Sequence, residues 1–320
     1  MAPYGCVMDH LPVIDPRKAL ANSAAGLFSH AEYPLAHSLD YRGDIGLFGP
    51  GSASWHVLGD VSSFIGGIRA LLIQAAHPEV VAGVADHSTY ERDPLGRLSR
   101  TSAYVAATGY GAMPEVEAAL RLVRRAHLPV KGVSHRGARY TASGGEFASW
   151  VHNVLIDSFI TAHQFFGREP LSAARADSFV EEQSRLGELL GATDLPTTTR
   201  SLHDWVRNHP ALDASPGMDS TVQFLRRPPL PLGVGMGYRV LFRAAVATIS
   251  PNLRDLIGIQ PYLGAITSGR MTIRGLQWSM GSSPSWWIAL QRTGTTVPDG
   301  VVFRQPPPAV GAAELFNSGA

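Results

Sequence analysis

Cys6 is the only cysteine in this 320-residue chain, and that scarcity excludes several kinds of site. A single thiol cannot form an intramolecular disulfide, hold an iron–sulfur cluster or build a cysteine-based zinc site. A chain without disulfides fits a reducing compartment. The N-terminus has no basic region followed by an apolar stretch, so no secretory signal is evident. We therefore expect a cytoplasmic protein.

Charged side chains are also few, at 17% of residues, and they nearly cancel, with 27 basic and 26 acidic residues. No tail or block of like charge is present, which argues against nucleic acid as a partner. The most apolar stretches, 61–76 and 238–249, are interrupted by arginines. Neither reaches the roughly 20 apolar residues that a membrane-spanning helix needs. The sequence predicts a soluble protein without a transmembrane segment.

Motifs of several common enzyme classes are missing as well. The chain contains no HExxH, Walker loop, paired carboxylate motif or GxSxG elbow. The glycines of 46–52 do not follow the GxGxxG pattern, and no strand precedes them. Hydrolase and nucleotide-binding functions therefore lack support.

What the sequence does contain is helical periodicity through most of its length, with 45% hydrophobic residues to build a core. We expect helices at about 16–29, 62–76, 80–84, 95–109, 114–127, 143–166, 172–190, 199–207, 216–226 and 234–249. No alternating strand pattern recurs. After residue 263, Gly, Ser, Thr and Pro dominate around three tryptophans. The prediction is an all-α fold, with a helical domain over 1–263 and an irregular tail over 264–320.

His127 ends the helix predicted at 114–127 and shares a face with apolar residues. Val116, Leu120, Val123 and His127 are separated by 4, 3 and 4 residues, which is the spacing of one helix face. An imidazole directed into a core could ligate a haem iron. On the residues alone, a core histidine bonded to a carbonyl group is the commoner explanation.

Arg97, Arg100 and Thr101 lie about thirty residues upstream, within one helical turn. Such a cluster is usually a solvated helix face. Beside a haem, either arginine could instead donate a charge-assisted hydrogen bond to bound dioxygen or peroxide. Thr101 would then position a water molecule or the distal oxygen.

Five motifs in this order and spacing resemble the MpaB-like oxygenase family, which includes rubber oxygenases. They are residues 46–52 (GLFGPGS), 66–78 (GGIRALLIQAAHP), 93–101 (DPLGRLSRT), 123–127 (VRRAH) and 150–152 (WVH). The resemblance covers roughly residues 40–260. It implies a globin-like, all-helical bundle that encloses haem b.

The resemblance also assigns roles to individual residues. His127 matches the axial iron ligand, and Arg97 and Thr101 match residues of the distal helix. Arg100 stands where the rubber-cleaving relatives have a lysine. Because a guanidinium stays protonated and cannot ligate iron, we expect an open or water-bound sixth position. The glutamate base of those relatives has no counterpart, so polyisoprene cleavage is in doubt.

Two further roles remain open at this stage. Arg124 or Arg125 could pair with a haem propionate, as could Arg97 or Arg100. The second ring nitrogen of His127 needs an acceptor, either Asp157 or a backbone carbonyl.

The resemblance therefore predicts a haem b-dependent oxygenase or oxidase that uses dioxygen or peroxide on an apolar small molecule, such as a natural-product or prenyl-type compound. The reaction could be C=C cleavage, hydroxylation or dehydrogenation. Two other classes stay open: a non-catalytic haem carrier or sensor, and a metal-free helical protein that binds an apolar ligand or a second copy of the chain in a homo-oligomer.

Overall fold

The computed structural model describes residues 15, 17–18, 30–88 and 90–304, and helices make up almost all regular structure in these ranges. The helices are η1 (Ser38–Tyr41), α2 (Ala53–Leu58), α3 (Ser63–Gln74), α4 (Pro78–His87), α5 (Pro94–Tyr110), α6 (Met113–His127), α7 (Gly145–Phe166), α8 (Ala173–Leu189), α9 (Thr199–Arg207), α10 (Pro216–Arg226), α11 (Leu232–Ala247), α12 (Pro251–Leu256), α13 (Ala265–Met280) and α14 (Pro284–Thr293). The predicted all-α class is confirmed. The helix expected at 16–29 lies almost entirely outside the described residues. No helix in the described ranges is long and apolar enough to cross a membrane.

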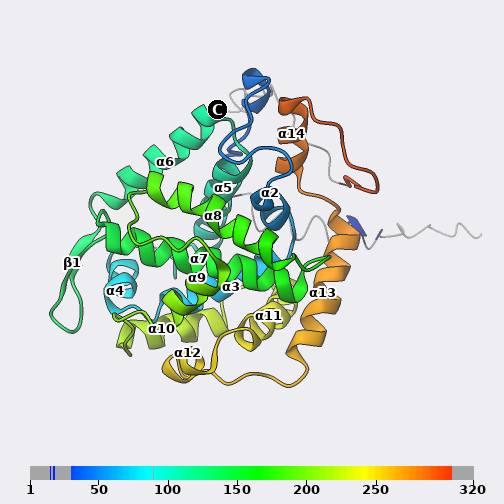
Figure 1. Ribbon diagram of the computed structural model, residues 1–320. Coiled ribbons are helices and arrows are strands. Elements are labelled where there is room, and N and C mark those ends of the chain that lie inside the picture. Colours follow the sequence, from blue (N-terminus) through cyan, green and yellow to red (C-terminus); the bar gives the residue numbers. More distant parts are fainter. Residues whose placement is uncertain (1–14, 16, 19–29, 89, 305–320) are drawn as a thin grey trace, which may run out of the picture.

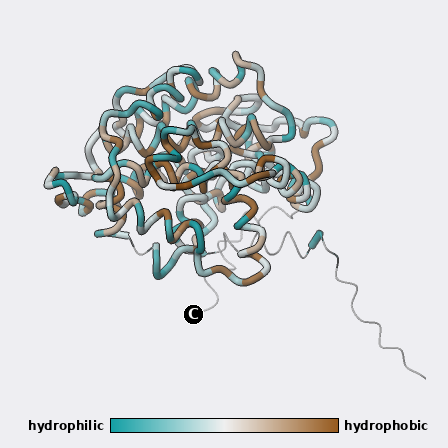
Figure 2. The backbone as a smooth tube through the Cα atoms, turned by 90° about the horizontal axis from the view of Figure 1, so that it is seen from below, coloured by the Kyte–Doolittle hydropathy of each residue, from teal (hydrophilic) through white to brown (hydrophobic). Residues whose placement is uncertain are grey.

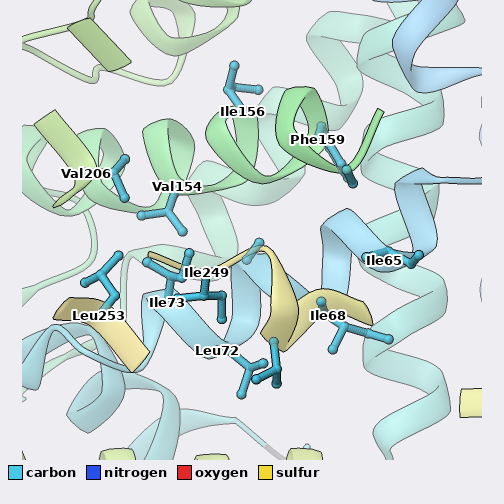
Figure 3. Close-up of a cluster of buried hydrophobic side chains, with 14 of the residues drawn as sticks. Ile65, Ile68, Leu72, Ile73, Val154, Ile156, Phe159, Val206, Ile249 and Leu253 are labelled. Atoms are coloured by element: carbon cyan, nitrogen blue, oxygen red, sulfur yellow. The ribbon is translucent and has the colours of Figure 1, made fainter. Parts of the chain in front are cut away.

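Helix α7 runs through the middle of the molecule and organises the core (Figure 1). It packs along α3 on one side and contacts α8 and α9, while α11 crosses α3 and reaches α13. Figure 3 shows Val154 of α7 directed towards Ile73 of α3, with Ile249 and Leu253 completing the same cluster. Each such fully buried aliphatic side chain stabilises the fold by about 1.5–3 kcal/mol. Polar stretches of the chain lie mainly on the outside (Figure 2).

The α3–α7 crossing is close because Gly66 has no side chain. A Cβ at Gly66 would lie 2.8 Å from Cδ1 of Phe159 and 3.1 Å from the carbonyl oxygen of Ser158. The neighbouring Gly67 faces open space, with no atom within 4 Å of a Cβ. Two adjacent glycines of one helix therefore have opposite packing requirements.

Alanine at these two glycines should change stability in opposite directions. Gly66→Ala should lower the free energy of unfolding by about 1–3 kcal/mol, because the methyl group overpacks the helix crossing. Gly67→Ala should raise it by up to about 1 kcal/mol through helix propensity. Urea unfolding followed by circular dichroism measures both. Equal effects of the two substitutions would contradict this account of the crossing.

A short antiparallel hairpin, β1 (Lys131–Val133) and β2 (Arg139–Thr141), follows α6 and packs on α4. It protrudes at the left of Figure 1. The sequence does not predict this hairpin, because strands of three residues are too short to show an alternating pattern.

The C-terminal segment is more helical than the sequence predicted. Residues 264–320 were expected to be irregular, but α13 and α14 occupy 265–280 and 284–293. Helix α13 packs on α11 and α7, where a Cβ at Gly269 would lie 2.7 Å from Cβ of Ala244. The helical body thus continues past residue 263, and irregular structure in the described ranges follows Thr293. Residues 305–320 lie outside the described residues.

A buried arginine of helix α14 forms hydrogen bonds with three other segments of the fold. Arg292 donates to the carbonyl oxygens of Asp44 (2.8 Å) and Tyr110 (2.7 Å) and to the hydroxyl of Ser38 (2.5 Å). Glu115, at the start of α6, lies 3.7 Å from the same guanidinium. This side chain joins α14 to η1, α5 and α6, so α14 belongs to the folded body.

Candidate functional site

His127 is the last residue of α6, and its side chain is exposed. The predicted apolar face is buried only at its beginning, where Val116 and Leu120 pack against Leu186 of α8. His127 therefore does not point into the core as the helix pattern suggested. Partial desolvation lowers the pKa of the imidazole, which favours a neutral ring with a free nitrogen lone pair.

Hydrogen bonds fix the backbone around His127. Its carbonyl oxygen accepts from the amide of Val130 (3.1 Å) and from the hydroxyl of Ser143 (3.4 Å). Among the described residues, the ring nitrogens have no hydrogen-bond partner. Helix α7 has Gly144 at its N-cap position, and Ser143 helps to hold the end of α6.

Arg97 is the most enclosed member of the predicted cluster on α5. Its Nη1 donates to the hydroxyl of Ser88 (3.0 Å), and its guanidinium lies 5.6 Å from the ring centre of Tyr90. Burial lowers the pKa of Arg97 from its usual value, but a guanidinium remains protonated at neutral pH.

Arg100 and Thr101 are exposed on the same helix. Arg100 pairs with Asp93 at 3.2 Å, and both side chains are about half exposed, so the pair adds little stability. The hydroxyl of Thr101 donates to the carbonyl oxygen of Arg97 (3.0 Å), which leaves its oxygen lone pairs free to accept.

The end of α4 connects the α5 cluster with the end of α6. Ser88, which binds Arg97, directly follows His87, and the ring of His87 bonds the carbonyl oxygen of Lys131 (3.2 Å). Lys131 directly follows Val130, whose amide binds His127. Helices α5 and α6 also contact each other and are joined by only two residues. The structure thus brings the arginine cluster and His127 to the same side of the molecule.

Apolar side chains near His127 are left uncovered. Leu122 and Leu128 on and after α6, and Val133 on β1, each expose more than half of their surface. Leu98, next to Arg97 on α5, is 38% exposed. Exposed apolar side chains, an imidazole and arginines are the kinds of groups that bind a flat apolar group with acidic edges.

Arg124 and Arg125 differ in their surroundings. The guanidinium of Arg124 donates to the carbonyl oxygen of Leu189 at the end of α8. It lines a cavity of about 330 Å³ that does not include His127 and is formed by Met113, Glu117, Leu120, Arg121, Arg124 and Leu189. Arg125 is exposed beside His127 in the chain. Of the two, Arg125 is the one whose guanidinium has no hydrogen bond or ion pair among the described residues.

Asp157 is not available to His127, because it belongs to a buried charge cluster on the opposite helices. Arg69 of α3 donates to Oδ2 of Asp157 (2.5 Å) and to the hydroxyl of Ser158 (2.8 Å). The Nδ1 of His203 on α9 binds the other carboxylate oxygen. Burial alone would raise the pKa of Asp157, but the positive charge of Arg69 and the bond to His203 hold it below its usual value. Asp157 is therefore an ionised structural group.

Asp157 stands out in the sequence, but its partners Arg69 and His203 were not predicted. A usable signal was present, because Arg69 and Asp157 each interrupt an otherwise apolar helix, and buried charges require partners. The pairing itself spans 88 residues, and no local pattern specifies it.

Other buried histidines are neutral groups of the core. Burial lowers the pKa of His77 and that of His152 to about 4 each. His77 lies among Phe147, Trp150 and His209, with ring centres 5.6–5.8 Å away. No group of three or more His, Cys, Asp or Glu side chains in the described ranges is arranged to hold a metal ion. A haem iron needs only one protein ligand.

Comparison with known families now identifies the fold. A family described as "ER-bound oxygenase mpaB/B'/Rubber oxygenase, catalytic domain" matches residues 55–278. The chain belongs to this family. The matched segment runs from α2 almost to the end of α13 and contains every predicted site residue, so the predicted family is confirmed. Comparison with curated proteins gives no match, and neither does comparison with solved structures.

Membership of an oxygenase family makes the chain an oxygenase-type enzyme. The match also continues through most of α13, past the predicted boundary at residue 263. Sequence and structure therefore agree that α13 is part of the catalytic domain rather than of a separate tail.

Proposed function

We propose that this enzyme is a haem b-dependent oxygenase that acts on an apolar small molecule, with His127 as the axial iron ligand. The observation that supports this most is the imidazole of His127, which is neutral, exposed and free of hydrogen bonds among the described residues. Such a ring offers a nitrogen lone pair to iron at no cost in lost hydrogen bonds.

The residues around His127 fit a haem in composition. Leu122, Leu128 and Leu98 offer apolar surface for the porphyrin, and Arg125 offers a cation for a propionate. Once covered by the porphyrin, the three leucines would lose their contact with water, which stabilises the complex.

Arg97 and Thr101 would interact with the oxidant and with water. Arg97 is held by Ser88 and Tyr90, so its cationic donors are fixed before the oxidant binds. Thr101 can accept a hydrogen bond from a water molecule while it donates to its own helix. Arg100 would not compete for the iron, because a guanidinium stays protonated and cannot act as a ligand.

Bound haem would supply the activation of dioxygen or peroxide, and the protein would supply position and polarity. His127 would set the electron density at the iron through its neutral ring. Arg97 would donate to the oxidant and stabilise negative charge that develops on it. The apolar side chains would exclude water and bind the substrate.

Titration of the purified full-length chain with haem tests this function. We expect a Soret band that saturates at one haem per chain, and dioxygen or peroxide consumption with members of a panel of prenyl-type alkenes. Arg97→Ala should keep the Soret band and lower turnover on the order of 100-fold. Arg121→Ala serves as the control, because Arg121 is an exposed arginine of α6 that pairs with Glu117.

Two outcomes would contradict the proposed function in different ways. A protein that stays colourless after haem titration would exclude the haem site. If the haem-loaded protein consumes no additional oxidant with any of the prenyl-type alkenes, it would instead be a carrier or sensor.

A further inference from the structure

A continuous chain of aromatic rings leads from the end of α4 through the core to the surface at α9. Successive ring centres are 6.5 Å apart for His87–Tyr140, 6.0 Å for Tyr140–Phe147, 5.8 Å for Phe147–His77, 5.6 Å for His77–Trp150 and 6.0 Å for Trp150–Trp205. Aromatic pairs at such distances are common in protein cores. Here the three oxidisable members, Tyr140, Trp150 and Trp205, also have unusual polar partners.

Tyr140 stands at the end near the proposed haem site. His87, its ring neighbour, bonds Lys131 of the segment that follows His127. The ring of Tyr140 is closely packed against two glycines. A Cβ at Gly132 would lie 2.6 Å from the phenolic oxygen, and a Cβ at Gly83 would lie 3.4 Å from the ring. The phenol donates to Oδ2 of Asp86 at 2.6 Å. A carboxylate at this distance can take the phenolic proton when the ring is oxidised.

Trp205 stands at the other end, half-buried at the surface of α9. Its indole Nε1 donates to Oδ2 of Asp194 at 2.5 Å. Asp194 has a φ of 53°, and among the described residues it is the one non-glycine with positive φ. Asn153 of α7 holds this conformation through the carbonyl oxygen of Asp194 (3.3 Å). Backbone strain of this kind persists where the surroundings enforce it, and here it places a carboxylate on an indole N–H.

Trp150 lies between the two ends and is fully buried. Its indole donates to the carbonyl oxygen of Gln74 (3.3 Å). Its neighbour His77 is neutral, because burial lowers the pKa of that ring to about 4. No positive charge on His77 would therefore oppose transient oxidation of Trp150.

We propose that Tyr140, Trp150 and Trp205 form a redox chain that ends in a surface site where Trp205 oxidises one-electron reductants, such as phenols, that are too large to reach the buried end. A tryptophan at the surface can meet a donor of any size, whereas the buried Tyr140 cannot. The source of oxidising equivalents, peroxide or dioxygen activated by haem, rests on the proposed function.

The electrons and protons balance at each step. Tyr140 gives one electron to the oxidant and its phenolic proton to Asp86. The tyrosyl radical regains an electron from Trp150 and the proton from Asp86, and Trp150 is reduced in turn by Trp205. Trp205 gives its indole proton to Asp194. The phenolic reductant finally gives one electron to Trp205 and releases its own proton to water, and Asp194 returns the indole proton.

Flash photolysis tests the redox chain in haem-free protein, with oxidation starting at Trp205. A ruthenium photo-oxidant in solution is expected to produce an indolyl radical in the full-length protein, followed by a tyrosyl radical, both detected by transient absorption and electron paramagnetic resonance. Tyr140→Phe should lose the tyrosyl signal and keep the indolyl signal. Trp205→Phe should lose the tyrosyl signal because the entry point is gone. Trp286→Phe, whose ring packs on Phe303, should behave as wild type.

Asp194→Asn gives a second test that keeps every ring in place, since asparagine also tolerates positive φ. It should leave the indole of Trp205 protonated on oxidation, so that a radical cation replaces the neutral indolyl radical. Formation of the Tyr140 radical in Trp205→Phe at the wild-type yield would overturn the redox chain. So would a wild-type protein in which no Tyr140 radical forms.

Haem-loaded enzyme separates this inference from the proposed function. With peroxide, oxidation of a phenol attached to a large polymer should be lost in Trp205→Phe, while turnover of small alkenes persists. If flash photolysis shows electron transfer along the redox chain but the protein binds no haem, only the proposed function fails. If haem enzyme turns over alkenes and Trp205→Phe still oxidises the polymer-bound phenol, the surface site fails.

Discussion

Replacement of His127 by alanine is expected to abolish the Soret band of the haem-titrated protein and, with it, all oxygen consumption. His127 is a neutral imidazole at the end of α6 with no competing hydrogen bond among the described residues. Because the side chain is exposed, its removal leaves no cavity, and the free energy of unfolding of the apo-protein should change by less than about 0.5 kcal/mol. Absorption titration and urea unfolding measure the two effects separately.

Two controls make this result specific to ligation. His135→Ala removes another exposed histidine from the nearby hairpin and should leave the Soret band unchanged. His127→Gly should recover part of the band when imidazole is added, because the free base can replace the missing ligand. A Soret band of wild-type intensity in His127→Ala would rule out His127 as the ligand.

Asp157→Ala should cause the largest loss of stability, about 3–5 kcal/mol, because it leaves the buried guanidinium of Arg69 without a counterion. The Arg69 and Asp157 side chains are each less than a tenth exposed, so water cannot replace the lost carboxylate. The pair also joins α3 to α7, the two helices at the centre of the core. Equilibrium unfolding in urea gives the change directly.

Two further variants show where this cost arises. Asp204→Ala removes an exposed carboxylate from α9, next to His203, and should change stability by less than about 0.5 kcal/mol. The double variant Arg69→Met with Asp157→Ala should be more stable than Asp157→Ala alone, because no unpaired charge remains buried. If Asp157→Ala and the double variant were equally stable, the unpaired charge of Arg69 would not be the cause of the lost stability.

Several helices were predictable because their ends carry local signals. At α5, the carboxylate of Asp93 accepts from the amide of Gly96 (2.9 Å) and Pro94 occupies the first turn. At α10, Ser215 precedes Pro216 and its hydroxyl accepts from the amide of Met218 (3.1 Å). Such caps act over three or four residues, so the chain displays them without any tertiary context.

Helices α13 and α14 escaped prediction because their residues have weak helix propensity. Their stability comes from contacts that are remote in sequence. Gly269 allows α13 to approach Ala244 of α11, and Arg292 binds Ser38 of η1, which lies 254 residues away. A glycine that weakens an isolated helix thus strengthens its packing in the folded protein.

The position of His127 shows the limit of periodicity most directly. The spacing of Val116, Leu120 and His127 correctly places them along one face of α6. Leu186 of α8 covers the first part of that face, and His127 lies beyond it. Periodicity gives the direction of a side chain but not the length of the helix that packs against it.

The sequence by itself determined the helical class, most helix boundaries and the family, because periodic apolar residues, helix caps and motifs each occupy a short stretch of the chain. Only the tertiary structure decided that Asp157 pairs with Arg69 and His203, that the ring of His127 has no hydrogen-bond partner among the described residues, and that Trp205 meets the carboxylate of Asp194. Each of these depends on which distant segments lie against each other, and packing of the whole core sets that arrangement.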